Sequence, residues 1–313
     1  MHSLDQQVLE RVQAWLRQDR SVWLCTIVAT LGSSPRPVGS LFACADSGET
    51  AGSLSGGCVE EDLVEKLLAG AVDHAVIQEY GVTAEENERL GLPCGGRLEI
   101  LVEPLSRSGL PQIDTLLDAV RERQYLTRAV SLPGGEVSLE PATAFAPLSR
   151  TEALVRHTLG PRFRLLLIGA GALSETLSQL ASAMDYQVMV NDPRPEALQR
   201  WQGEAVARIA GMPDDAVRAY ADDPHSIVLT LTHDPRIDDM ALMQALEQDL
   251  FYVGALGSVR TTEKRIQRLR DLGLTEAQLA RLHAPVGLPI GSKTPMEIAI
   301  AILAELTQLR RRP

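Results

Sequence analysis

The sequence predicts an α/β protein, in which a mixed α/β N-terminal domain is followed by a doubly wound parallel sheet. Three observations support this fold class. The chain has 313 residues, enough for two domains of ordinary size. Its first half combines short β-branched runs with turns, and from about residue 162 apolar strands alternate with helices. A loop-like stretch between these patterns predicts domains at 1–140 and 162–313, joined by a linker at 141–161.

The composition is that of a globular protein. Apolar residues make up 45% of the chain, charged residues 23%, and the formal net charge is −11. An acidic chain disfavours nucleic acid and anionic membrane as main partners. No apolar run approaches the roughly 20 residues of a membrane span. Leu4, Val8, Val12 and Trp15 have helical spacing, so we expect an N-terminal amphipathic helix rather than a signal peptide, and a cytoplasmic protein with reduced thiols.

The elements of the first domain follow from its apolar patterns. A nearly continuous apolar run predicts a buried strand at 21–30, and a hairpin is expected at 40–54. Helical spacing predicts a helix at 58–71, followed by strands near 74–81 and 97–105.

The second domain alternates strands and helices up to a well-marked final helix. The expected strands are 163–171, 187–192, 226–232 and 251–256. Thr294 and Glu297 form a capping box around Pro295, which suits the first helical position. Thr275 and Gln278 repeat this device, so two helices are expected to close the domain.

A glycine turn in the second domain is typical of nucleotide sites. Gly169, Gly171 and Ser174 form G-x-G-x-x-S between a strand and a helix, where backbone can approach a pyrophosphate. Asp192 ends the next strand and is placed to accept hydrogen bonds from a ribose. These features predict a Rossmann-like sheet that either holds a nucleotide or keeps the fold without one.

Further polar residues follow other strands of this sheet. His233 and Asp234 come directly after one strand, and they could move protons or form a turn and helix cap. Gly257 and Ser258 follow the next strand and could present amides to an anion. Because these turns share one sheet edge, they predict a ligand crevice.

Three segments of small residues in the first domain could form an anion site. They lie at 32–40, 53–61 and 92–100. Arg36 suits a phosphate or a pterin-like ring, and backbone amides next to glycine pairs can cradle an anion. The candidate residues are Ser33, Ser34, Arg36, Ser55, Gly56, Gly57, Cys58, Cys94, Gly95 and Gly96.

The four cysteines differ in their surroundings. Cys25 and Cys44 lie inside strand patterns and are expected to be packed core thiols. Cys58 begins a helix, where the dipole favours a thiolate, although acidic residues follow it. Cys94 also stands beside a glycine pair. No C-x-x-C pair is present, which disfavours a structural zinc site.

These motifs together resemble the XdhC/CoxI family of molybdenum cofactor chaperones. The resemblance rests on GSSPRPVGS, GSLSGGCVEEDL and LPCGG in the first domain. In the second domain it rests on LLLIGAGALSE, VNDPRPE, LTHDPRID, YVGALGSVRTTEKR and APVGLPIGSKTPMEIAIAILAE. The sequence departs from the family pattern at GAGALSE, where members of the family usually read closer to GAGHVG.

The resemblance implies a protein that shields the molybdenum cofactor, supports its sulfuration and inserts it into a xanthine dehydrogenase or aldehyde oxidoreductase-type apoenzyme. The transient cargo is molybdopterin or its cytosine dinucleotide form, with a possible nucleotide in the Rossmann-like domain. The implied partners are the large subunit of an apo-molybdoenzyme, a cysteine desulfurase, a cofactor nucleotidyltransferase and a second copy of the chain. Cys58 is then the expected contact to molybdenum or sulfur.

Two other classes of function stay open at this point. An NAD(P)-dependent oxidoreductase would use the second domain, with His233 as acid or base, but leaves the cysteine–glycine segments unexplained. A thiol-redox protein would need Cys58 and Cys94 close together.

Overall fold

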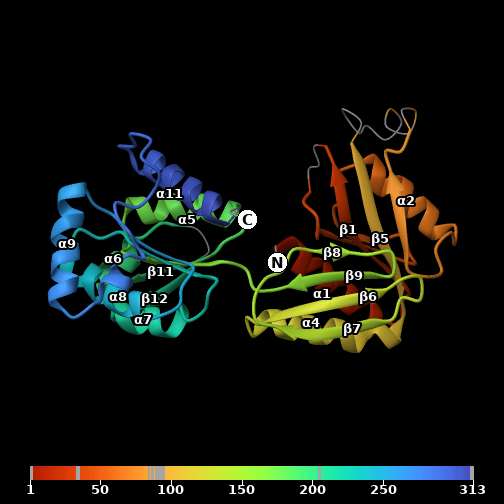
Figure 1. Cartoon of the computed structure of the whole chain (residues 1–313), viewed down its shortest axis with the longest axis horizontal. Coiled ribbons are helices and arrows are strands. Elements are labelled where there is room, and N and C mark those ends of the chain that lie inside the picture. Colours follow the sequence, from red (N-terminus) through yellow and green to blue (C-terminus); the bar gives the residue numbers. More distant parts are fainter. Residues whose placement is uncertain are drawn as a thin grey trace. The chain divides into compact units, whose positions relative to one another are not determined.

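The computed structural model describes residues 3–32, 36–83, 85, 88, 96–203 and 206–310. The chain divides into two compact units, Met1–Pro161 and Arg162–Pro313 (Figure 1). Among the described helices, none is long and apolar enough to cross a bilayer.

Unit 1 is built on a five-stranded antiparallel sheet. Its strands, in spatial order, are β3 (Thr50–Gly52), β2 (Leu41–Ala45), β1 (Val22–Leu31), β5 (Arg97–Leu105) and β4 (Val76–Tyr80). β2 and β3 form the expected hairpin, and β1, β4 and β5 lie where the sequence predicts strands.

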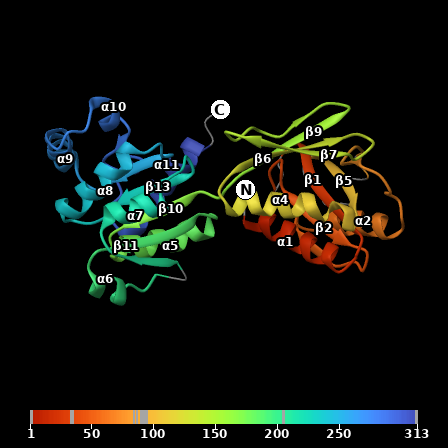
Figure 2. The ribbon, with the colours of Figure 1, turned by 90° about the horizontal axis from the view of Figure 1, so that it is seen from below.

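Helices cover both faces of this sheet. Two helices, α1 (Ser3–Arg17) and α4 (Leu110–Arg121), lie side by side along unit 1 (Figure 2). The short helix η2 (Arg107–Gly109) directly precedes α4. They share a core with Leu24, whereas the neighbouring Cys25 packs with α2 (Cys58–Leu68). Because successive strand residues point to opposite faces, this run of apolar residues fills two cores. The prediction that Cys25 and Cys44 are buried core thiols is confirmed.

A second antiparallel sheet completes unit 1. Its order is β7 (Val137–Ala142), β6 (Tyr125–Ser131), β9 (Leu154–Leu159) and β8 (Ser149–Arg150). Residues 141–161, which we expected to be a linker, therefore contain β8 and β9 and belong to unit 1. β9 pairs with β6 along its length, an interaction between distant residues that the mixed polar pattern of this segment does not signal.

Unit 2 is a six-stranded sheet in which every strand pair is parallel. Its order is β12 (Ala207–Ala210), β11 (Gln187–Asp192), β10 (Arg164–Ile168), β13 (Ser226–Thr230), β14 (Tyr252–Ala255) and β15 (Leu282–His283). This is the strand order 3-2-1-4-5-6 of the Rossmann fold. The chain order reverses between β10 and β13, and ligands of such sheets bind beyond the carboxyl ends of these strands.

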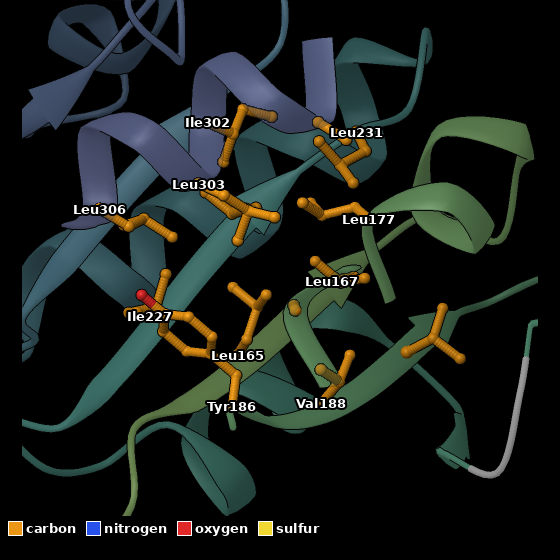
Figure 3. Close-up of a cluster of buried hydrophobic side chains, with 14 of the residues drawn as sticks. Leu165, Leu167, Leu177, Tyr186, Val188, Ile227, Leu231, Ile302, Leu303 and Leu306 are labelled. Atoms are coloured by element: carbon orange, nitrogen blue, oxygen red, sulfur yellow. The ribbon is translucent and has the colours of Figure 1, made fainter. Parts of the chain in front are cut away.

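Helices cover both faces of the parallel sheet as well. They are α5 (Ala172–Ala183), α6 (Pro195–Arg200), α7 (Pro213–Tyr220), α8 (Pro235–Glu247), α9 (Val259–Asp271), α10 (Glu276–Leu279) and α11 (Pro295–Arg310). Leu165 and Leu167 pack against α5 and α11 on one face (Figure 3), and Leu166 and Ile168 pack with α7 and α8 on the other. Burial on both faces explains why β10 is a continuous apolar run rather than an alternating one.

Candidate functional site

The loop at 53–57 in unit 1 forms the anion cradle that its glycines suggest, but Glu60 of the same chain fills it. One oxygen of the Glu60 carboxylate accepts hydrogen bonds from the Ser53 hydroxyl at 3.0 Å and from the amides of residues 54, 55 and 56 at 2.8 to 2.9 Å. The other oxygen accepts from the Ser55 hydroxyl at 2.5 Å and the Gly57 amide at 3.1 Å. The amides expected to bind a ligand are therefore engaged with Glu60.

The cradle keeps Glu60 ionised. Burial acts to raise the pKa of its carboxyl group, but the hydrogen bonds from Ser55, Gly56 and Leu54 outweigh burial and lower the pKa to about 2. Sequence reasoning missed this role, although the Gly57-x-x-Glu60 spacing is that of a glutamate that reaches back to cap its own helix.

Cys58 is the first residue of α2, directly after this loop. Its thiol is exposed and free. Gly56 has a φ of +89°, which favours glycine, and a Cβ built on Gly56 or Gly57 would meet no atom within 4 Å. Two of the acidic neighbours are paired, Glu60 with the loop and Asp62 with Lys66 at 2.7 Å. The thiol thus stands beside open space on a backbone fixed by Glu60.

Arg36 also has a partner within the chain. Its guanidinium lies 3.3 Å from the buried carboxylate of Asp5, which accepts a hydrogen bond from the Leu41 amide at 2.9 Å as well. Arg36 therefore attaches its loop to α1. This pairing joins residues 31 apart in sequence, and no local pattern indicates it.

Two of the three small-residue segments meet at one end of the sheet. Leu31 pairs with Arg97 at the end of β1 and β5, and a Cβ on Gly32 would lie 3.5 Å from the Cα of Gly96. Ser33, Ser34, Cys94 and Gly95 lie outside the described residues. In the described part of the chain, no three His, Cys, Asp or Glu side chains gather so as to hold a metal ion.

The glycine turn of unit 2 has the geometry of a Rossmann phosphate loop. Gly169 has a φ of +114°, and a Cβ there would lie 2.7 Å from Cγ2 of Thr232. A Cβ on Gly171 would meet nothing within 4 Å. The first glycine is therefore needed by the turn, and the second leaves room for a ligand to approach α5.

Ser174 replaces the third glycine of the motif and is used internally. Its hydroxyl donates to the Gly171 carbonyl at 2.8 Å and accepts from the Gly171 amide at 2.9 Å and from the Trp201 indole at 3.0 Å. Ser174 is 1% exposed, so its hydroxyl is buried with all three of these hydrogen bonds in place. The serine is therefore compatible with the fold. Its hydroxyl is already bonded to the Gly171 amide, so that amide is not free to bind a ligand.

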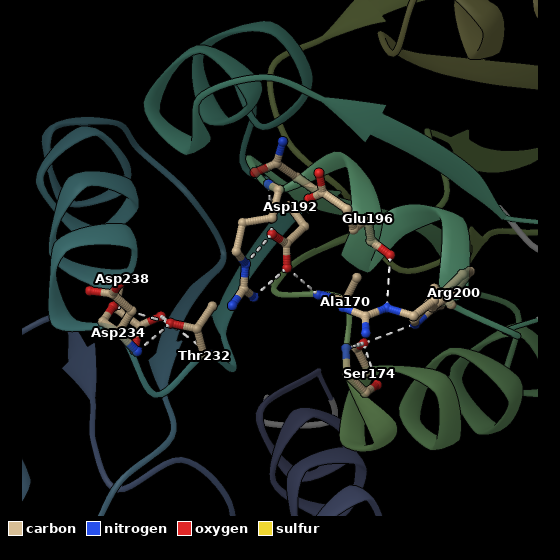
Figure 4. A network of polar contacts seen from close by, with 12 residues as sticks. Ala170, Ser174, Asp192, Glu196, Arg200, Thr232, Asp234 and Asp238 are labelled. Atoms are coloured by element: carbon tan, nitrogen blue, oxygen red, sulfur yellow. Dashed lines mark hydrogen bonds and ion pairs between the residues drawn. The ribbon is translucent and has the colours of Figure 1, made fainter.

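Asp192, which we expected to accept hydrogen bonds from a ribose, is surrounded by hydrogen-bond donors of the chain itself (Figure 4). Its carboxylate accepts from the amides of Ala170 and Arg194, each at 2.9 Å, and from the Arg194 guanidinium through two bonds of 2.8 Å. Burial acts to raise the pKa of Asp192, but these bonds outweigh it and lower the pKa. Asp192 is therefore a buried anion that fixes both the glycine turn and Arg194.

Of the remaining predicted residues of unit 2, Asp234 and Ser258 are helix caps, His233 lies at the surface and Gly257 is half-buried. Asp234 caps α8 and accepts from the Arg236 amide at 3.0 Å and from its guanidinium at 2.7 and 3.0 Å. These bonds to Arg236 lower the pKa of Asp234 to about 2. Ser258 caps α9, and His233 is exposed.

A pocket of about 840 Å³ opens at the point where the strand order reverses. Its walls bring together Gly169, Gly171, His233 and Asp234 from the predicted set. Arg194, Arg236 and Lys293 also line it, and the sequence did not single them out. Gly257 and Ser258 are not part of its lining.

A parallel sheet in the order 3-2-1-4-5-6, with a glycine turn at its switch point, defines unit 2 as a Rossmann domain. It follows an antiparallel unit that carries an exposed thiol beside a glycine loop. The chain belongs to the XdhC and CoxI family. The model of that family matches residues 15–81, and the model of the XdhC Rossmann domain matches residues 165–306.

Relatives of known name cover nearly the whole chain. A Bacillus subtilis protein named as a probable subunit of xanthine dehydrogenase is 25% identical over 96% of this chain and 97% of its own length. The molybdenum cofactor insertion chaperone PaoD of Escherichia coli is 27% identical over 94% of this chain and 85% of its own length. A solved structure described as a xanthine dehydrogenase from Bacillus halodurans has a TM-score of 0.77 at 27% identity, covering 98% of this chain and 96% of that one.

Proposed function

We propose that the protein is a molybdenum cofactor chaperone, which holds the cofactor, supports its sulfuration and inserts it into an apoenzyme of the xanthine dehydrogenase or aldehyde oxidoreductase type. Membership of the XdhC and CoxI family supports this proposal. The name of PaoD, a molybdenum cofactor insertion chaperone that aligns along 94% of this chain, supports it further.

The observation that carries the proposal is the exposed Cys58 thiol beside the fixed loop at 53–57. A soft thiolate is a suitable ligand for molybdenum and a suitable carrier of sulfur. Gly56 and Gly57 carry no side chain that would obstruct the approach of a bulky pterin to that sulfur. The cargo is molybdopterin or its cytosine dinucleotide form, and a nucleotide occupies the pocket of unit 2.

The partners follow from this task. They are the large subunit of an apo-molybdoenzyme as acceptor, a cysteine desulfurase as sulfur donor, a cofactor nucleotidyltransferase as source of the dinucleotide form, and a second copy of the chain. An oxidoreductase that uses His233 is less well supported, because the Asp234 carboxylate is bonded to Arg236 rather than orienting the imidazole.

Cofactor content after purification tests the proposal. Protein isolated from cells that make the cofactor should contain molybdenum and pterin in equal amounts. Cys58→Ala should lower both at least tenfold, because the soft ligand is removed, whereas Cys44→Ala changes a buried core thiol and should leave both unchanged. Metal analysis measures the molybdenum content, and fluorescence after acid oxidation measures the pterin content.

The outcomes separate the alternatives. Unchanged content in Cys58→Ala would remove Cys58 as a ligand. A cofactor-free wild-type protein that oxidises or reduces a substrate with NAD(P) would replace the chaperone proposal by the oxidoreductase.

A further inference from the structure

The lining of the unit 2 pocket is positively charged, in contrast to the chain as a whole. Arg194, Arg236 and Lys293 contribute three cations to its walls, of which Arg194 pairs with the buried Asp192 and Arg236 with Asp234. The formal net charge of the chain is −11. Within the described residues, the Lys293 ammonium takes part in no ion pair. Such a local field in an acidic protein favours an anionic ligand.

At the edge of this pocket, the Asp192 carboxylate at the end of β11 has its acceptor positions filled by donors of the chain. An ionised carboxylate has about four lone-pair positions. On Asp192, Oδ1 accepts from the amide and Nε of Arg194, and Oδ2 accepts from the Ala170 amide and from Nη2 of Arg194. The side chain is 0% exposed. A ribose diol would therefore have to displace a donor that Asp192 already holds.

Arg194 instead presents donors at the same place. Its side chain is 55% exposed and lines the pocket, and it uses Nε and Nη2 for Asp192, so that Nη1 takes no part in the bonds to that carboxylate. A guanidinium held in place by a buried carboxylate is a rigid fork suited to phosphate oxygens. Because the space over Gly171 is open, a pyrophosphate can approach the start of α5 in the same pocket.

We infer that Arg194 is the specificity-determining residue of this pocket, and that it selects a dinucleotide whose ribose carries a 2′-phosphate over one with a free 2′,3′-diol. This inference rests on the proposal that the unit 2 pocket holds a nucleotide, and it is independent of the cargo at Cys58. In Rossmann domains an arginine near the end of the second strand accommodates a 2′-phosphate, and an acidic residue accommodates the diol. Here the acidic residue is present and serves to orient the arginine.

NADP⁺ and NAD⁺ differ only in the 2′-phosphate, so their binding to the purified full-length protein tests the inference. Titration calorimetry should show NADP⁺ binding at least tenfold more tightly than NAD⁺. Arg194→Gln removes the phosphate donors and at the same time frees acceptor positions on Asp192, so it should reverse the preference toward NAD⁺. Arg194→Lys keeps the charge without the fork and should retain a reduced preference for NADP⁺.

Arg270→Gln is the matched control, because Arg270 is an exposed arginine paired with Glu276 outside the pocket lining. It should leave both affinities unchanged. Equal binding of the two dinucleotides, or an unchanged ratio in Arg194→Gln, would overturn the inference and leave the nucleotide pocket standing. Failure of both dinucleotides to bind the wild-type protein would overturn the inference together with the nucleotide pocket, and would leave the assay of cofactor at Cys58 unaffected.

Discussion

Arg265→Ala is expected to lower the free energy of unfolding by about 3–5 kcal/mol, the usual result when one partner of a buried ion pair is removed. Nη2 of Arg265 lies 2.9 Å from Oδ2 of Asp238, and its Nη1 donates to the Leu256 carbonyl at 3.0 Å. The side chains of Arg265 and Asp238 are 4% and 1% exposed. Alanine would leave the Asp238 carboxylate buried without its cation. Urea denaturation of the full chain, followed by circular dichroism, measures the change.

Arg268→Ala is the control for this experiment. Arg268 bonds to Asp239 at 2.6 and 3.1 Å, but its side chain is 38% exposed, and without it Asp239 keeps Arg265 Nε at 3.8 Å, so its loss should cost less than that of Arg265. If Arg265→Ala lowered the free energy of unfolding no more than Arg268→Ala does, the buried pair of Arg265 and Asp238 would have no special role in stability. Replacing both partners, as Asp238→Leu with Arg265→Met, should recover most of the loss because no charge is then left buried alone.

The same pair predicts how the defect of Arg265→Ala depends on pH. Burial raises the pKa of Asp238 to about 6, while Thr232 and Arg265 act to lower it. Without Arg265 the folded-state pKa rises further above the unfolded value, so the folded state binds a proton more readily. The variant should therefore be closest to wild type at pH 5 or below and most destabilised at pH 8.

Glu60→Ala is expected to release the loop at 53–57 and to weaken retention of the molybdenum cofactor at least tenfold. The variant removes the acceptor of six hydrogen bonds, so a cost of about 2 kcal/mol in unfolding free energy is expected, since part of these donors can turn to water. Glu61→Ala is the matched control, because Glu61 is the exposed neighbour on the same helix. Cofactor content and urea denaturation are measured on both variants. Equal cofactor content in the two variants would contradict a role for the loop in holding Cys58.

Acid should reproduce part of this effect in the wild-type protein. The folded-state pKa of Glu60 is about 2, below its ordinary value of 4.5. Its contribution to stability is therefore fully present above pH 4.5 and is lost as the pH falls toward 2. Glu60→Ala should lack this part of the pH dependence, which denaturation series between pH 2 and 6 would show.

Local patterns were sufficient to predict the fold class, the first sheet of unit 1 and the strands β10, β11, β13 and β14 of unit 2. The apolar run at 163–171 gives β10 and its glycine turn, and the Thr294 to Glu297 capping box marks the start of α11, where the Glu297 carboxylate accepts from the Thr294 amide at 2.9 Å. Both signals lie within a few residues of the element they specify. The second sheet of unit 1 was missed because its strands are specified by pairing between distant residues: β9 pairs with β6, from Leu126 with Leu159 to Ser131 with Leu154, and β8 pairs with β9.

The candidate site was predicted in part, for a related reason. Residue types and glycine spacing located the loop at 53–57, the turn at Gly169 and the thiol of Cys58. They did not show that Glu60 fills the loop or that Arg194 saturates Asp192. A ligand can use a buried carboxylate only if donors of the chain do not already fill its acceptor positions. Side-chain geometry decides which donors do so, and the sequence alone does not show that geometry.

Transfer of the cofactor is the most direct test of the chaperone account. Protein purified from cofactor-producing cells is mixed with an apo-molybdoenzyme of the xanthine dehydrogenase type, the two are separated again, and molybdenum, pterin and acceptor activity are measured. The account predicts that cofactor leaves the chain and that activity of the acceptor rises in proportion to it, with at most one cofactor delivered per chain. Cofactor that stays on the chain while the acceptor remains inactive, or acceptor activity that is the same with cofactor-free Cys58→Ala protein, would contradict it.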